Sequence, residues 1–141
     1  MSASLTKKPQ ALKVILDSNA LFVPLKFKID IFEEIGHLLN RNVEFVLLSP
    51  VKRELELLAA KDSPKVRREA VYALRLAEKC KYVAIEEHGD ATDDVIARVA
   101  KNWNSPVFTN DRALKKRLRD ISVPVIYVRQ KSRLDMDGLI S

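Results

Sequence analysis

The sequence predicts an α/β fold with three α/β/α layers, in which helices cover both faces of a central, mostly parallel sheet of about five strands. Two observations predict this fold. Short apolar runs of strand length alternate with longer amphipathic stretches, and the connections between them are short. The chain has 141 residues, of which 47% are hydrophobic, so it is large enough for one domain with a substantial core.

The first predicted unit is a strand at residues 12–17 followed by a helix at residues 29–39. The strand sequence LKVILD is a short aliphatic run that ends in an acid, a composition typical of a buried strand. In the helix, Ile31, Ile35 and Leu38 fall on one face, and acids occupy the first turn, where the helix dipole favours negative charge.

The second predicted unit is a strand at residues 43–48 followed by two helices. Ser49 and the proline after it predict the start of a helix at residues 51–61, with Ser49 as the N-cap. Ser63, also followed by proline, predicts a second helix at residues 65–79. Both helices are amphipathic.

The rest of the chain continues the alternation of strands and helices. Thr92 is expected to cap one of these helices. The remaining predicted elements are a strand at 82–85, a helix at 92–103, a strand at 106–108, a helix at 112–119 and a strand at 123–128.

Composition excludes several classes of protein. Lys and Arg number 25 against 19 Asp and Glu, so the formal net charge is +6 and nucleic acid is a favoured partner. Cys80 is the only cysteine, which excludes an internal disulfide and a cysteine-rich zinc site. No apolar run is long enough to cross a membrane, and the N-terminus lacks the pattern of a signal peptide. We therefore expect a cytoplasmic protein that does not associate with membranes.

Four connections of the predicted sheet carry acids toward the same edge. In an open α/β sheet, reactive groups gather beyond the carboxyl ends of the strands. Asp17 ends the first strand, Glu54 lies one turn into the helix after the second, and Asp111 follows the fourth. Asp93 and Asp94 open the helix after the third strand. We expect these side chains to converge.

Converging carboxylates need a cation, because their charges repel and raise one another's pKa. Oxygen ligands without His or Cys favour Mg²⁺ or Mn²⁺, and one or two such ions can activate water for attack on a phosphodiester. Each acid also has a simpler interpretation as a helix cap or a solvated residue. Asp17 is the hardest to explain in that way, since an acid at the end of a buried strand must find a partner.

The segments VILDSNALF, IDIFEEI, SPVKREL, TDDVIARVA, VFTNDRALKKRL and VPVIYVR, in this order, resemble those of the PIN-domain endoribonucleases. The similarity is greatest to the archaeal and eukaryotic branch that processes ribosomal RNA, and VapC-type toxin nucleases are more distant relatives. The resemblance implies Mg²⁺- or Mn²⁺-dependent hydrolysis of RNA phosphodiester bonds, leaving a 5′-phosphate and a 3′-hydroxyl, in the maturation of ribosomal or other RNA.

The resemblance also implies roles for particular residues. The matched acids, expected to be catalytic and to bind the metal, are Asp17, Glu54, Asp93 and Asp111. Asp94 is the reserve ligand, because adjacent helical residues point about 100° apart and Asp93 lies nearer the apolar face. Asn19 and Thr109 match the polar residues that support the metal ligands.

The similarity covers residues 12–129, which we take as a PIN-like nuclease domain. Residues 1–11 are then an N-terminal extension, and the polar residues 130–141 are expected to form a flexible C-terminal tail. Basic residues gather directly after the last acid. We expect four of them to contact RNA: Arg112, Lys115, Lys116 and Arg117.

Several alternatives stay open at this stage. A VapC-type toxin restrained by an antitoxin would use the same chemistry as an RNA-maturation enzyme, whose partners would be RNA and a ribosome-assembly factor. A homodimer could form through the helices at 51–79. A non-catalytic RNA-binding scaffold would be expected to have lost some of the acids, and the set here is complete. A phospho-receiver domain needs a different order of acids.

Overall fold

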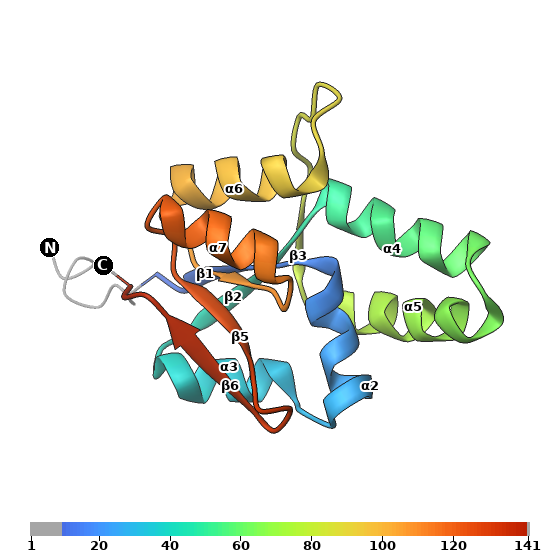
Figure 1. Cartoon of the computed structure of the whole chain (residues 1–141), viewed down its shortest axis with the longest axis horizontal. Coiled ribbons are helices and arrows are strands. Elements are labelled where there is room, and N and C mark those ends of the chain that lie inside the picture. Colours follow the sequence, from blue (N-terminus) through green and yellow to red (C-terminus); the bar gives the residue numbers. More distant parts are fainter. Residues whose placement is uncertain (1–9, 141) are drawn as a thin grey trace, which may run out of the picture.

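A six-stranded sheet forms the centre of the protein, and its order is β3-β2-β1-β4-β5-β6 (Figure 1). The computed structural model describes residues 10–140. The strands are β1 (Leu12–Leu16), β2 (Val43–Leu48), β3 (Lys81–Val83), β4 (Val107–Phe108), β5 (Val125–Arg129) and β6 (Arg133–Asp137). All neighbouring pairs are parallel except β5 and β6, which pair antiparallel.

Helices lie on both sides of this sheet. They are the 3₁₀ helix η1 (Ser18–Phe22) and the α-helices α2 (Val23–Phe27), α3 (Ile31–Leu39), α4 (Ser49–Lys61), α5 (Pro64–Ala77), α6 (Thr92–Trp103) and α7 (Arg112–Asp120). In Figure 1, α6 and α7 lie above the sheet, α3 lies below it, and α4 and α5 extend to the right as a pair. The predicted three-layer α/β fold is therefore confirmed. No helix in residues 10–140 is long and apolar enough to span a membrane.

The core is built around β1, whose residues Val14, Ile15 and Leu16 are all fully buried. A central parallel strand is covered on both faces, so its side chains are apolar in succession instead of alternating. Phe108 of the neighbouring strand β4 is also fully buried. These strands place the next residue along the chain, in each case a polar one, at the carboxyl edge of the sheet.

Of the three residues predicted to cap helices, one does so in the structure and two do not. Ser63 does cap α5, since its hydroxyl accepts a hydrogen bond from the Val66 N–H at 3.4 Å. Ser49 lies inside α4, and its hydroxyl instead accepts from the Ile85 N–H at 3.0 Å. Thr92 begins α6 without capping it, since the N-cap position belongs to the preceding alanine.

The C-terminal segment is ordered in part, contrary to the flexible tail expected at 130–141. Residues 133–137 form β6, which is why the sheet has six strands. Leu134 is buried and Met136 is partly buried, so alternate side chains of the strand pack against the core while the others face solvent. The sequence RLDMD does alternate charged and apolar residues, but its three charged residues made it resemble a polar tail, so the strand was not predicted. Most of the predicted N-terminal extension lies outside the described residues.

Candidate functional site

Asp17 is the centre of a hydrogen-bonded cluster at the carboxyl edge of the sheet. Its side chain is buried, with 4% of the residue exposed. The Thr109 hydroxyl donates to its Oδ2 at 2.8 Å, and Asn19 Nδ2 donates to the same oxygen at 2.9 Å. The Ser18 N–H donates to Oδ1 at 2.8 Å. Both carboxylate oxygens are therefore held in place, as a buried charge requires.

Strand pairing brings this cluster together. Leu16 pairs with Phe108, and the Asp17 N–H donates to the Phe108 carbonyl at 3.0 Å. Asp17 and Thr109 therefore leave β1 and β4 side by side, although they are far apart in the sequence. Asn19 connects the same two loops, since its Oδ1 accepts from the Asn110 N–H at 2.9 Å. The predicted supporting residues Asn19 and Thr109 thus contact Asp17 directly.

Asp111 joins the cluster and also caps a helix. Its Oδ1 accepts from the Leu114 N–H at 3.0 Å, which makes it the N-cap of α7. Its own N–H donates to the Thr109 hydroxyl at 3.1 Å. The cap fixes one carboxylate oxygen of Asp111 at the edge of the sheet, within the electrostatic reach of Asp17.

The charges of neighbouring acids contribute to a raised pKa at two residues of the site, Asp17 and Asp93. The pKa of Asp17 is raised chiefly by burial, opposed by its hydrogen bonds from Thr109 and Ser18, and raised further by the charges of Glu54 and Asp111. The pKa of Asp93 is raised by burial, then by the charges of Asp17 and Asp111. Glu54, from α4, and Asp93, from α6, therefore act on the same region as the Asp17 cluster.

Asp93 and Asp94 have different surroundings. Asp93 is only partly exposed, and its pKa is raised by burial and then by the charges of Asp17 and Asp111. The Asp94 carboxylate forms an ion pair with Arg117 of α7 at 2.5 Å, and its side chain is half exposed. This pairing favours Asp93 over Asp94 as the acid available to a ligand, while the choice of direct ligand stays a prediction.

The donor set fits a hard cation, because it offers carboxylate oxygens whose mutual repulsion a positive charge would relieve. Within residues 10–140, no group of three or more His, Cys, Asp or Glu residues is arranged closely enough to enclose a metal ion by itself.

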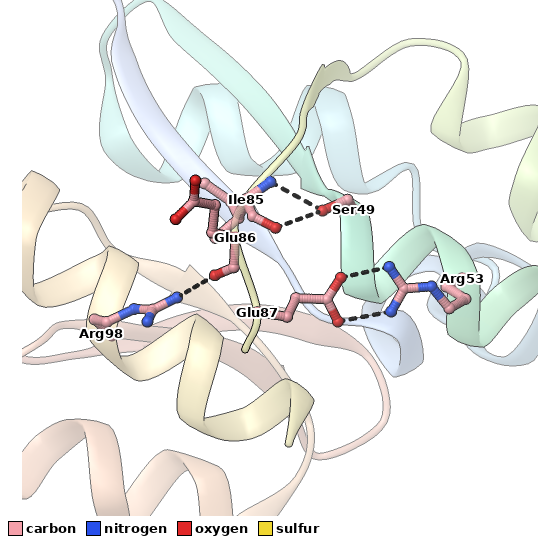
Figure 2. A network of polar contacts seen from close by, with 6 residues as sticks. All are labelled: Ser49, Arg53, Ile85, Glu86, Glu87 and Arg98. Carbon is pink, nitrogen blue, oxygen red and sulfur yellow. Dashed lines mark hydrogen bonds and ion pairs between the residues drawn. The ribbon is translucent and has the colours of Figure 1, made fainter. Parts of the chain in front are cut away.

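An ion pair that sequence reasoning missed joins the helix of Glu54 to the loop before α6. Arg53 donates from both terminal nitrogens to the Glu87 carboxylate, and the Nη1–Oε1 distance is 2.6 Å (Figure 2). The two side chains are separated by 34 positions in the sequence, so no local pattern predicts their contact. The ion pair lies beside Glu54 and holds that turn of α4 against the loop.

The same loop is also tied to α6. Arg98 donates to the Glu86 carbonyl at 2.8 Å (Figure 2). Its guanidinium also lies 3.5 Å from the Asp90 carboxylate. The Ser49 hydroxyl donates to the Ile85 carbonyl at 3.4 Å, in addition to accepting from its N–H. The loop that leads to Asp93 is therefore fastened at both ends.

Of the four residues predicted to contact RNA, two line a surface groove and two lie outside it. Arg112 and Lys115 line a groove of ≈ 690 Å³ between α7 and the β5–β6 hairpin, which we call the basic groove. Thr109 is one of its lining residues and is hydrogen-bonded to Asp17, so the groove adjoins the Asp17 cluster. Arg117 instead pairs with Asp94, and Lys116 is exposed outside the groove.

The chain matches the PIN-like domain family over residues 14–131. Ribonuclease VapC4 of Methanocaldococcus jannaschii is 36% identical over 129 residues, which cover 91% of this chain and 98% of that protein. Ribonuclease VapC9 of Archaeoglobus fulgidus is 29% identical over 126 residues, covering 89% of each chain. The solved structure of the PIN domain endonuclease Utp24 superimposes with a TM-score of 0.76 and 28% identity, covering 91% of this chain and 92% of that one.

The chain therefore belongs to the PIN-like domain family. Its fold and its family were both predicted correctly from the sequence motifs. Its relatives in the two comparisons are ribonucleases and an endonuclease by name, in agreement with the predicted class of activity.

Proposed function

We propose that this protein is a metal-dependent endoribonuclease that hydrolyses RNA phosphodiester bonds. One observation carries the proposal: a buried Asp17, fixed by Thr109, Asn19 and Ser18, lies at the edge of the sheet where other acids raise its pKa. A structural role alone does not account for burying a carboxylate among like charges. Membership of the PIN-like domain family and relatives named as ribonucleases support the proposal.

Each residue of the cluster has a defined task in this proposal. Asp17, Glu54, Asp93 and Asp111 hold Mg²⁺ or Mn²⁺, directly or through water. The cation, when bound, supplies an activated water and neutralises charge on the phosphate. Thr109 and Asn19 orient the Asp17 carboxylate, a supporting role typically worth 10- to 100-fold in metal affinity. Arg112 and Lys115 attract the RNA backbone to the groove beside this cluster.

The proposal is tested by cleavage of a labelled single-stranded RNA with Mn²⁺, Mg²⁺ or EDTA. Asp17→Asn should abolish cleavage while leaving RNA binding in EDTA intact. Asp120→Asn is the matched control, because Asp120 is an exposed acid at the far end of α7 and removes the same charge. Cleavage that persists in Asp17→Asn or in EDTA would contradict the proposed chemistry. Binding without any cleavage would favour the RNA-binding scaffold.

The biological role within this chemistry has two candidates. Structural similarity to Utp24 favours RNA maturation with a ribosome-assembly partner, whereas 36% identity to VapC4 favours a toxin with an antitoxin. Expression of wild type and Asp17→Asn in a heterologous host separates them. Growth arrest that depends on Asp17 would support a toxin, and accumulation of an unprocessed RNA after depletion in the native cell would support maturation.

Self-association is a separate proposal. The pair formed by α4 and α5 presents Leu57, Val71 and Tyr72 to solvent, with between 42% and 50% of each residue exposed. Exposed apolar side chains on a projecting helix pair make it a candidate contact surface. Sedimentation equilibrium of wild type and Leu57→Glu tests the predicted homodimer, and a monomeric wild type would contradict it.

A further inference from the structure

Glu54 and Asp93 differ from the other acids of the site in how their positions are fixed. The carboxylates of Asp17 and Asp111 accept hydrogen bonds from neighbouring groups. Within residues 10–140, no side-chain hydrogen bond or ion pair holds the carboxylate of Glu54 or Asp93. Their positions are therefore set by the placement of the helices that carry them, α4 and α6.

The segment at residues 84–91 lies between these two helices and contacts α4 at two points. It leads from β3 to α6 and is neither helix nor strand. The Ser49 hydroxyl bonds to the N–H and the carbonyl of Ile85, and Arg53 pairs with the Glu87 carboxylate (Figure 2). Ser49 and Arg53 are four residues apart, so they lie on one face of α4 about 6 Å from each other along its axis.

The same segment contacts α6 from its other side. The carbonyl of Glu86 accepts from Arg98 at 2.8 Å, whereas the residues before and after Glu86 contact α4 (Figure 2). The Arg98 guanidinium also lies 3.5 Å from the Asp90 carboxylate. Residues 84–91 therefore connect α4 to α6 through side chains of both helices.

A tight turn joins the two ion pairs. The Asp90 N–H donates to the Glu87 carbonyl at 2.8 Å, and the two residues between them, His88 and Gly89, have φ angles of 50° and 78°. Positive φ at both central positions is the geometry of a type I′ turn. Glu87 at one end of the turn pairs with α4, and Asp90 at the other end pairs with α6. We call Arg53, Glu87, Asp90 and Arg98 the α4–α6 bridge.

Stability alone does not account for this bridge. The Arg53 side chain is 55% exposed, and an ion pair so open to water contributes little to the free energy of unfolding. Its geometry is nevertheless specific, because two nitrogens of Arg53 donate to the two oxygens of Glu87 and so fix the orientation of both side chains. Arg53 directly precedes Glu54, and Arg98 belongs to the helix whose first turn carries Asp93. The bridge therefore acts on the backbone that places these two acids.

We propose that Arg53 and Glu87 are positioning residues for a divalent cation, because their ion pair holds α4 against the segment before α6 and so fixes Glu54 relative to Asp93. The inference rests on the proposed function, in which both acids bind the cation together with Asp17. Both already act electrostatically on Asp17. Arg53 and Glu87 act through the backbone, without contacting the cation.

The test measures Mn²⁺ binding by electron paramagnetic resonance, because the signal of free aqueous Mn²⁺ decreases when the ion binds to protein. Arg53→Gln should weaken Mn²⁺ affinity about 10-fold, the lower end of the range for residues that support metal ligands. Removal of a positive charge near a cation site would by electrostatics alone leave the affinity unchanged or raise it. A weaker affinity therefore distinguishes positioning from a charge effect.

Two further variants test the ion pair itself. Arg53→Lys keeps the charge but cannot donate from two nitrogens of a planar group, so it should weaken Mn²⁺ affinity about 5-fold. Exchange of the partners, Arg53→Glu with Glu87→Arg, restores an ion pair and should bring the affinity to within about 3-fold of wild type. Exchanged partners that bind Mn²⁺ as weakly as Arg53→Gln would overturn the proposal.

Arg41→Gln is the matched control, because Arg41 is exposed in the loop before β2, at the amino end of that strand, and loses the same charge. Its Mn²⁺ affinity should differ from wild type by less than about 2-fold, since distant surface charges are screened. Equal affinities of Arg53→Gln and Arg41→Gln would overturn the proposal. Thermal melts in EDTA should place Arg53→Gln within a few degrees of wild type, and a large decrease would assign the weaker binding to unfolding and also overturn it.

Cleavage of labelled RNA provides a second measurement. Arg53→Gln should need about 10-fold more Mn²⁺ for half-maximal cleavage and should reach the wild-type rate when Mn²⁺ is saturating. A lower rate at saturating Mn²⁺ would contradict a role confined to positioning. Equal Mn²⁺ binding by wild type and Asp17→Asn would refute the metal site of the proposed function and this inference with it. Binding that depends on Asp17 but not on Arg53 would refute the positioning role alone.

Discussion

Replacing Thr109 by Val removes one buried hydroxyl and little else, because the two side chains have nearly the same shape. Thr109 is fully buried. Its hydroxyl donates to the Asp17 carboxylate at 2.8 Å and accepts from the Asp111 N–H at 3.1 Å. A hydrogen bond to a charged group contributes about 1.5–3 kcal/mol. Asp111 is exposed, so water can replace the partner of its N–H. We expect the free energy of unfolding to fall by about 1.5–3 kcal/mol at neutral pH.

The same substitution has a predictable pH dependence. The Thr109 hydrogen bond lowers the pKa of Asp17 against the larger effect of burial. Its loss raises the folded-state pKa further, so the folded variant binds a proton more readily than folded wild type. The stability difference between the two proteins should therefore be largest when Asp17 is ionised and should shrink as pH falls through its pKa.

Urea unfolding in EDTA at pH values from about 3 to 7 measures this difference. Thr92→Val is the matched control, since Thr92 lies at the start of α6 without serving as its cap. The control should change stability by less than about 0.5 kcal/mol. The reasoning would be refuted by a Thr109→Val effect as small as that of the control, or by an effect that does not vary with pH.

Three further predictions concern other parts of the chain. In EDTA, Asp17→Asn should become more stable relative to wild type as the pH rises above 3.8, because the raised pKa of Asp17 means that its ionised form destabilises the folded state. In thermal melts, Mn²⁺ should raise the melting temperature of wild type and not that of this variant. Burial raises the pKa of the Cys80 thiol from 9.0 to about 12, a difference of about 3, so mass spectrometry should find alkylation at pH 8 about 1,000-fold slower than in urea. Arg53→Ala should accelerate amide exchange in the loop that holds Glu87, whereas Lys61→Ala on the same helix should not.

Sequence reasoning succeeded where a local pattern has one structural outcome. The run VIL before Asp17 is typical of a buried strand, and the position of the acids at strand ends follows from the topology of a parallel sheet. The cap residue Ser63 was also recognisable, because serine before proline is a local signature. These features need no knowledge of how distant segments pack.

It failed where the outcome depends on tertiary contacts. Ser49 has the same Ser-Pro sequence, yet its hydroxyl bonds to Ile85 from a loop 36 positions away, so it lies within the helix instead of capping it. The ion pair of Arg53 with Glu87, 34 positions apart, is equally non-local. The neighbouring residues in the sequence do not indicate these contacts, so the structural role of each residue could not be predicted from its local pattern.

In the proposed function, Asp111 is both a helix cap and a functional acid, and its geometry allows the two roles together. Its Oδ1 satisfies the Leu114 N–H at the start of α7, and its backbone N–H is satisfied by the Thr109 hydroxyl that also holds Asp17. The cap therefore fixes one carboxylate oxygen, while the second oxygen takes no part in capping. A carboxylate has two acceptor oxygens, so a single side chain can begin a helix and still offer a ligand at the edge of the sheet.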